Sequence, residues 1–123
     1  MPWSLEDARG LLKASIRDNN PVVFLENEMM YGVEFDTTPE MMDADFLIPL
    51  GKAKVERKGN DLTIVAVSKM VGHSLKAAEE LKDKHNIDVE VINLRTIRPL
   101  DRNSVIESVK KTHRLVTVEE GWP

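Results

Sequence analysis

The chain opens with a pattern typical of an amphipathic helix followed by a buried strand. Ser4 can cap the free amides of a first turn, and Asn-Asn-Pro at 19–21 ends the helix, because the residue before proline disfavours the helical region. One predicted helical face carries the apolar residues Leu5, Ala8, Leu12 and Ile16. The run 22–25 is apolar throughout and predicts a strand buried on both faces of a parallel sheet.

The second half alternates between strand and helix patterns. Runs at 54–57 and 62–67, separated by a polar turn, predict a hairpin. Residues 74–84 predict a helix that buries Leu75, Ala78 and Leu81.

The same alternation continues to the end of the chain. A strand is predicted at 89–92, then a helix capped by Asp101 that presents Val105, Ile106 and Val109, and a last strand at 115–118. Strands that alternate with helices predict an α/β fold with a parallel, doubly wound sheet and right-handed crossovers.

Residues 33–50 show no sustained period, which predicts a linker between 1–32 and 51–123. The alternative is a long surface loop within one domain. Charge supports a division, because residues 1–50 hold three basic and ten acidic residues, a net of −7. Residues 51–123 hold fourteen basic and eleven acidic residues, a net of +3.

Composition narrows the function classes. With 123 residues, 41% hydrophobic and 31% charged, the chain has the balance of a globular protein. No apolar run approaches the roughly 20 residues of a membrane span, and a net charge of −4 argues against nucleic acid as the main partner. The absence of cysteine excludes disulfides and thiolate chemistry.

Several side chains are candidates for chemistry. Glu26 and Glu28 follow the first predicted strand, where carboxylates two residues apart share a face and raise one another's proton affinity, although pairing with arginines is favoured. The next three residues, 29–31 (Met-Met-Tyr), fit an interface or an apolar pocket, or ordinary core filling. The histidines at 73, 85 and 113 lack metal-ligand spacing and are expected to be solvated or capping.

Two further segments carry charged or polar side chains suited to binding an ion. Arg95 and Arg98 lie between a strand and a capped helix, where they can bind a phosphate or carboxylate, or lock the connection through Asp101 or Glu119. At the end of the first helix, oxygens of residues 18–20 meet the negative end of the helix dipole, a setting that suits hard cations. Plain capping by asparagine is the favoured alternative there.

Several strings of the sequence resemble the beta-subunit family of pyruvate dehydrogenases, within the transketolase-like group. They are DARGLLK (7–13), IRDNNPVV (16–23), LENE (25–28), YG (31–32), IPLGKAK (48–54), VINLRTIRPLD (91–101) and LVTVE (115–119). The resemblance implies the end of a thiamine-diphosphate-binding pyrimidine domain at 1–32. A linker at 33–50 and part of a transketolase C-terminal-like parallel-sheet domain at 51–123 would follow.

The resemblance also implies an activity: oxidative decarboxylation of pyruvate with acetyl transfer to the lipoyl group of dihydrolipoyl acetyltransferase. Thiamine diphosphate and Mg²⁺ would be shared with an alpha subunit in an alpha2-beta2 heterotetramer, in the mitochondrial matrix or a bacterial cytoplasm. The family's catalytic glutamate and histidine fall upstream of residue 1. The expectation is therefore a fragment with no catalytic or cofactor-binding residue of its own, and neither Glu26 nor His73 replaces them.

One family site carries over by resemblance, a structural potassium ion. Its oxygen donors fall on Ser15, Ile16, Asp18 and Asn20, and a further carbonyl donor is expected upstream. Two rival functions stay open: a non-catalytic assembly or docking module, and the beta subunit of a branched-chain 2-oxo acid dehydrogenase.

Overall fold

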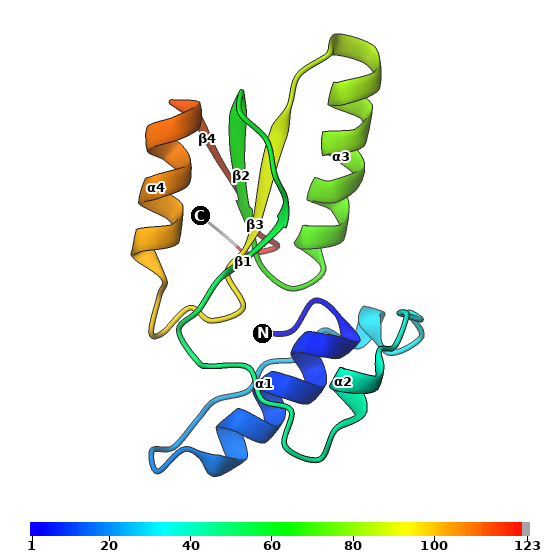
Figure 1. Cartoon of the computed structure of the whole chain (residues 1–123), viewed down its shortest axis with the longest axis vertical. Coiled ribbons are helices and arrows are strands. Elements are labelled where there is room, and N and C mark those ends of the chain that lie inside the picture. The colour runs from blue at the N-terminus through cyan, green and yellow to red at the C-terminus, as the bar shows by residue number, and fades with distance from the viewer. Residues whose placement is uncertain (122–123) are drawn as a thin grey trace.

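The computed structural model describes residues 1–121 and places a sheet between two helices, with a smaller helical part at one end (Figure 1). The smaller part contains α1 (Leu5–Arg17), the 3-10 helix η1 (Glu28–Met30) and the short α2 (Pro39–Met42). The larger part is made of β1 (Lys54–Arg57), β2 (Leu62–Ala66), α3 (Met70–His85), β3 (Val89–Asn93), α4 (Arg102–Thr112) and β4 (Leu115–Val118). In residues 1–121, no helix has the length and apolar content that a membrane crossing requires.

The sheet has the strand order β1-β3-β2-β4, and β2 runs parallel to both β3 and β4. Ile64 belongs to a cluster with Ala78 of α3, whereas its neighbour Thr63 bonds to Ser108 of α4. Because adjacent strand residues point to opposite faces, the two helices cover opposite sides of the sheet. The predicted α/β fold is confirmed, with a mixed sheet in place of a purely parallel one.

The predicted hairpin between the first two strands is wrong. β1 pairs antiparallel with β3, with Lys54 opposite Asn93 and Val55 opposite Ile92. The connection to β2 crosses the start of β3 at Gly59, where an added Cβ would lie 2.2 Å from the carbonyl carbon of Val89. Only glycine permits this close approach, so the polar turn leads the chain over β3 instead of folding it back.

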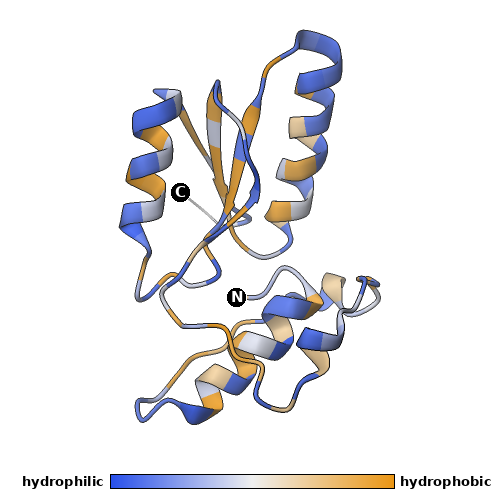
Figure 2. Ribbon diagram, viewed as in Figure 1, coloured by the Kyte–Doolittle hydropathy of each residue, from blue (hydrophilic) through white to orange (hydrophobic). Residues whose placement is uncertain are grey.

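The face of the sheet toward α3 is apolar. Ile64, Val89 and Val91 pack with Ala78, and Leu75 and Leu81 of α3 join this cluster, as the helical spacing predicted. Hydrophobic residues are concentrated in the strands, and the outer sides of the helices are largely hydrophilic (Figure 2). The main core of the described chain therefore lies between α3 and the sheet.

The face toward α4 is polar. Thr63 Oγ1 lies 2.7 Å from Ser108 Oγ and 2.6 Å from Thr112 Oγ1. Ser108 Oγ donates to Glu90 Oε1 at 2.5 Å, and Lys111 Nζ donates to Glu90 Oε2. The predicted cap by Asp101 is confirmed, because its side chain accepts from the Ser104 amide. The predicted apolar side of α4 is not its most deeply buried side, and Ile106 is 49% exposed. Hydrogen bonds from Ser108 and Thr112 replace apolar contacts between α4 and the sheet.

Helix α1 also differs from its predicted orientation. The Ser4 cap is confirmed, with Ser4 Oγ accepting from the Asp7 amide at 3.2 Å. The buried residues of the helix are Asp7, Gly10 and Leu11, whereas Ile16 of the predicted stripe is 74% exposed. The side of the helix that carries Asp7 faces the rest of the protein, because Asp7 is held by polar partners in the sheet part.

The predicted strand at 22–25 is not formed. The segment is extended, but Val23 is 83% and Leu25 51% exposed. The four strands of the described residues form a single sheet in the larger part of the chain. The segment 22–25 therefore has no neighbouring strand with which to form main-chain hydrogen bonds.

The unpatterned segment 33–50 folds back along α1. Arg9 donates to the carbonyl oxygens of Met42 and Asp43 at 3.2 and 3.4 Å. Ile48 is 4% exposed and packs on Gly10, where an added Cβ would lie 2.5 Å from its Cγ1 atom. The later part of the segment, from Met42 to Ile48, therefore packs on α1, whereas the predicted domain limits at 32 and 51 stay predictions.

A buried ion pair joins the two parts of the chain. Arg95 Nε donates to Asp7 Oδ1 at 2.7 Å, and the two side chains are 9% and 0% exposed. Asn93 Nδ2 donates to Asp7 Oδ2 at 2.7 Å, and the Trp3 amide donates to the same oxygen at 3.2 Å. Glu6 lies at the edge of this pair and bonds both Arg95 and Lys54.

We expect Asp7→Asn to lower the free energy of unfolding by about 3 kcal/mol, because it leaves the Arg95 guanidinium buried without a full counter-charge. Urea unfolding at neutral pH measures this. Glu6→Gln is the matched control: Glu6 is 23% exposed, so its loss should cost about 1 kcal/mol or less. Equal stability of Asp7→Asn and the wild type would contradict the role of the pair.

Glu90 gives the fold a pH dependence. Burial raises the pKa of this carboxyl, but bonds from Lys111, Ser108 and the Gly59 amide outweigh burial and hold the pKa below its usual value. A carboxyl with a lowered folded pKa stabilises the fold above its unfolded pKa of about 4.3, and this contribution is lost on acidification through the folded pKa. Glu90→Gln should therefore be less stable than wild type at pH 7, with a difference that narrows toward pH ~3.

Urea unfolding of both proteins across that range measures the effect. Glu107→Gln is the control, because Glu107 is exposed and paired with Lys110 at 2.8 Å on the outside of α4. A pH-independent difference for Glu90→Gln would refute the assignment.

Candidate functional site

The end of α1 carries the oxygen donors that the sequence singled out for a cation. Asp18 caps the helix, and its Oδ1 accepts from the Asn20 amide and from Asn20 Nδ2, both at 2.8 Å. These two bonds lower the pKa of Asp18, which is exposed. The carboxylate is therefore ionised at neutral pH beside the negative end of the helix dipole.

Ser15 and Ile16 contribute to this end of the helix in different ways. The Ser15 hydroxyl donates to the Leu11 carbonyl at 2.7 Å, so the group that it offers to an ion is its main-chain carbonyl. Ile16 is 74% exposed, and its carbonyl is one of the last four in the helix, which lack a partner within the helix. Main-chain carbonyls and one carboxylate are the donors that hard cations prefer.

The carboxylates predicted to share a strand face lie on different elements. Glu26 lies in the extended segment and accepts from the Tyr31 hydroxyl at 2.8 Å, whereas Glu28 begins η1. Neither pairs with an arginine, and the strand expected to align them is not formed.

The arginines of the 95–98 loop are also separated. Arg95 points inward to Asp7 and Glu6, so neither Asp101 nor Glu119 is its partner and it is not free for a phosphate. Arg98 is exposed and lines a cavity of about 450 Å³. The sequence did not single out Asp7, which appeared only within the string at 7–13.

The three histidines are exposed or capping, as expected. His73 is exposed in the first turn of α3, His85 ends that helix, and His113 caps α4 with a φ of 57°. No group of three or more His, Cys, Asp or Glu side chains in residues 1–121 is placed to hold a metal ion.

The larger cavity, of about 450 Å³, lies between α1, the extended segment 21–25 and the 96–99 loop. Its wall is mostly apolar, with Ser15, Asp18 and Asn20 at one end. The candidate cation donors therefore border this cavity.

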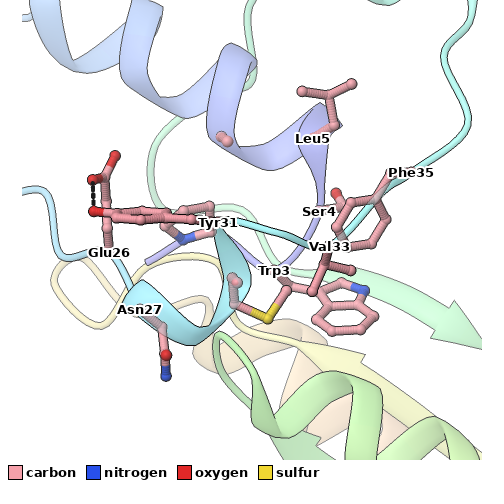
Figure 3. Close-up of a pocket in the computed structure, with 11 residues that line it drawn as sticks. Trp3, Ser4, Leu5, Glu26, Asn27, Tyr31, Val33 and Phe35 are labelled. Carbon is pink, nitrogen blue, oxygen red and sulfur yellow. Dashed lines mark hydrogen bonds between the residues drawn. The ribbon is translucent and has the colours of Figure 1, made fainter.

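The smaller cavity, of about 220 Å³, lies between the start of α1 and the segment 26–35 (Figure 3). Met30 and Tyr31 line it, as one of the two readings of 29–31 predicted. Trp3 and Phe35 also line it, with ring centroids 5.4 Å apart and planes at 88°. No sequence motif pointed to these two rings.

Comparison with known proteins gives closely similar relatives. The chain is 62% identical over 99% of its length to "Pyruvate dehydrogenase E1 component subunit beta, mitochondrial" of Chaetomium thermophilum, and 63% identical over 100% to the protein of that name in Pisum sativum. The human protein of that name is 59% identical over 99% of the chain. The chain spans about a third of these relatives, covering 32%, 34% and 34% of their lengths.

A solved structure shares the fold. A chain of "Split gene transketolase, inactive beta4 tetramer" aligns with a TM-score of 0.58 and 34% sequence identity. The alignment covers 67% of this chain and 27% of that one. The family model described as "Transketolase, C-terminal domain" matches residues 51–123, more than half of the sequence. With its sheet, helices and sequence all in agreement, the chain belongs to the transketolase C-terminal domain family.

Proposed function

We propose that this chain is a segment of the beta subunit of a pyruvate dehydrogenase, which acts within an alpha–beta assembly. The observation that carries the proposal is an identity of 59–63% to such subunits that extends over nearly the whole chain. The similarity includes residues 1–50, which lie outside the family model at 51–123.

The same relatives favour pyruvate over a branched-chain 2-oxo acid as the substrate of the whole enzyme. The proposed reaction is oxidative decarboxylation of pyruvate with acetyl transfer to a lipoyl group of dihydrolipoyl acetyltransferase. The proposed partners are the alpha subunit, in an alpha2-beta2 heterotetramer, and the acetyltransferase core. The mitochondrial names of the relatives support a mitochondrial location for this protein too.

The described residues do not fit a complete site for thiamine diphosphate and Mg²⁺. No cluster of three carboxylates or histidines is present within 1–121 to hold the metal. Glu26 is an exposed residue bonded by Tyr31, and His73 is an exposed helix residue. We therefore assign the cofactor to other parts of the assembly and derive no catalytic step from this chain.

The described residues do fit a potassium ion at the end of α1. The carbonyls of Ser15 and Ile16, the Asp18 carboxylate and the Asn20 side-chain oxygen would be its donors. The fit rests on the unpaired carbonyl end of the helix and on an ionised carboxylate beside it. Asn20 would turn its amide, because its nitrogen now points to Asp18.

A segment exchange tests the proposed function. We expect this chain, placed in the pea beta subunit instead of its 63% identical counterpart and co-expressed with the pea alpha subunit, to sustain pyruvate-dependent release of carbon dioxide. The matched control carries the corresponding segment of the transketolase relative, which is 34% identical, and should be inactive. An assembled but inactive chimera with this chain would contradict the proposal.

The chain alone should release no carbon dioxide from pyruvate, even with thiamine diphosphate and Mg²⁺, because its described residues hold no site for them. The pea enzyme assayed in parallel is the positive control. Turnover by the isolated chain would show that the missing cofactor site was misjudged.

Potassium should stabilise the chain against heat. At an ion concentration ten times the dissociation constant, binding adds about 1.4 kcal/mol, or roughly 5 °C in Tm. We expect this rise in potassium chloride over sodium chloride of equal concentration, and its loss in Asp18→Asn. Asp36→Asn removes an exposed acid from the same acidic part and should keep the rise. Equal Tm values in both salts would refute the site.

A further inference from the structure

The smaller cavity is lined by aromatic rings from separate parts of the chain. Trp3 precedes α1, Tyr31 follows η1, and Phe35 belongs to the segment after it. Trp3 and Phe35 meet edge to face at one side, and Tyr31 lies at the other side next to Glu26 (Figure 3). An added Cβ at Gly72 of α3 would lie 2.3 Å from the Trp3 ring, so the indole is packed and fixed in place.

Glu26 is the charged side chain of this cavity. Its Oε2 accepts from the Tyr31 hydroxyl at 2.8 Å, which leaves Oε1 for another donor. The other two polar side chains of the lining are committed: Ser4 Oγ accepts from the Asp7 amide, and Asn27 bonds Glu120 and the Met29 amide. The bond to Glu26 raises the pKa of Tyr31, so the phenol remains the donor in this hydrogen bond.

The charge that lines the cavity is negative and comes from Glu26 alone, since the nearby Lys69 is paired with Glu120 at 3.4 Å. Between residues 18 and 51 the sequence has eight acidic residues and no lysine or arginine. Clefts lined by one sign of charge attract counter-ions, so this cavity favours a cation. Aromatic faces favour the same kind of guest, since the ring quadrupole attracts a cation within about 6 Å of the centroid.

The size of the cavity limits the guest to one side chain. Its 220 Å³ is below the range of roughly 300–1,000 Å³ that is common for small-molecule sites. Around it the surface continues with exposed apolar residues, including Val33 at 45% and Met29 at 68%. An aromatic pocket with an apolar surround is typical of the contact that anchors a protein partner.

We propose that this cavity is a docking site for an arginine side chain presented by a partner protein. A guanidinium is planar, so it stacks on the rings of Trp3 or Tyr31 while its N–H groups donate to Glu26 Oε1. A lysine ammonium lacks the planar face. This site is independent of the pyruvate chemistry proposed above.

The probe is a capped pentapeptide with arginine at the centre and glycine on both sides. The matched probe carries citrulline, which has nearly the same shape without the charge. Binding is followed on the wild-type chain through the indole N–H resonance of Trp3, assigned with Trp122→Phe. We expect saturable shifts with a dissociation constant on the order of 1 mM for arginine and no saturation for citrulline.

Variants separate the parts of the site. Glu26→Gln should weaken binding about tenfold by removing a charge-assisted hydrogen bond. Tyr31→Leu should weaken it roughly two- to fivefold, whereas Tyr31→Phe keeps the ring and should bind as well as wild type. Tyr31 is 72% exposed, so these changes spare the fold. Glu40→Gln removes an equal charge in α2, outside the cavity, and should leave binding unchanged.

Three results would overturn the proposal. They are equal binding of both peptides, which would indicate an apolar guest, equal weakening by Glu26→Gln and Glu40→Gln, which would indicate unspecific attraction, and no saturable shift with arginine.

Discussion

The burial of one carboxylate, Asp7, is the constraint on which the arrangement of this chain depends. A fully buried carboxylate is tolerated only when it is paired and hydrogen-bonded, and Arg95 and Asn93 supply both at the end of β3. Arg95 holds a φ of 60°, a conformation that costs a residue with a side chain about 1 kcal/mol or more. The pair with Asp7 offsets that strain and fixes the direction in which α1 leaves the sheet part.

The two cation sites proposed for the N-terminal part share one electrostatic feature, an excess of acidic side chains. The ion at the end of α1 and the arginine near the start of α1 both rest on carboxylates, Asp18 and Glu26, that the long acidic segment holds. Of the basic residues near this segment, Arg9 and Lys13 donate to main-chain oxygens of residues 42–44, and Arg17 pairs with Asp45 at 3.6 Å. Asp18 and Glu26 form no ion pair within residues 1–121, so their charge is left for external partners.

The strands and helices of 51–123 were largely predictable, because their apolar periods reflect burial within the same part of the chain. The pairing of the strands was not predictable. The polar turn at 58–61 is typical of a hairpin, and only the close approach of Gly59 to β3 shows that the chain crosses β3 there. In residues 1–50 the periods misled. The apolar stripe of α1 and the run 22–25 predicted burial, but the buried side of α1 is that of Asp7, Gly10 and Leu11. It is set by polar partners at residues 93 and 95 and by the packing of Ile48 on Gly10.

The two candidate sites also differ in how far the sequence predicted them. Helix polarity and the oxygens of residues 18–20 suggested a cation at the end of α1, and the family resemblance added Ser15 and Ile16 as donors. This site stays a proposal. The cavity of Trp3 and Phe35 unites residues more than thirty positions apart without a motif, and it emerges only from the packing.

The pairing of β1 with β3 also sets an order of events during synthesis. The strand that pairs with β1 begins at Val89, 32 residues after Arg57, with β2 and α3 in between. At a translation rate of about 5–20 residues per second, β1 waits roughly 2–6 s for its partner to be made. Over that interval its main-chain donors and acceptors stay open, and the nascent chain depends on β2 and α3 collapsing without disturbing them.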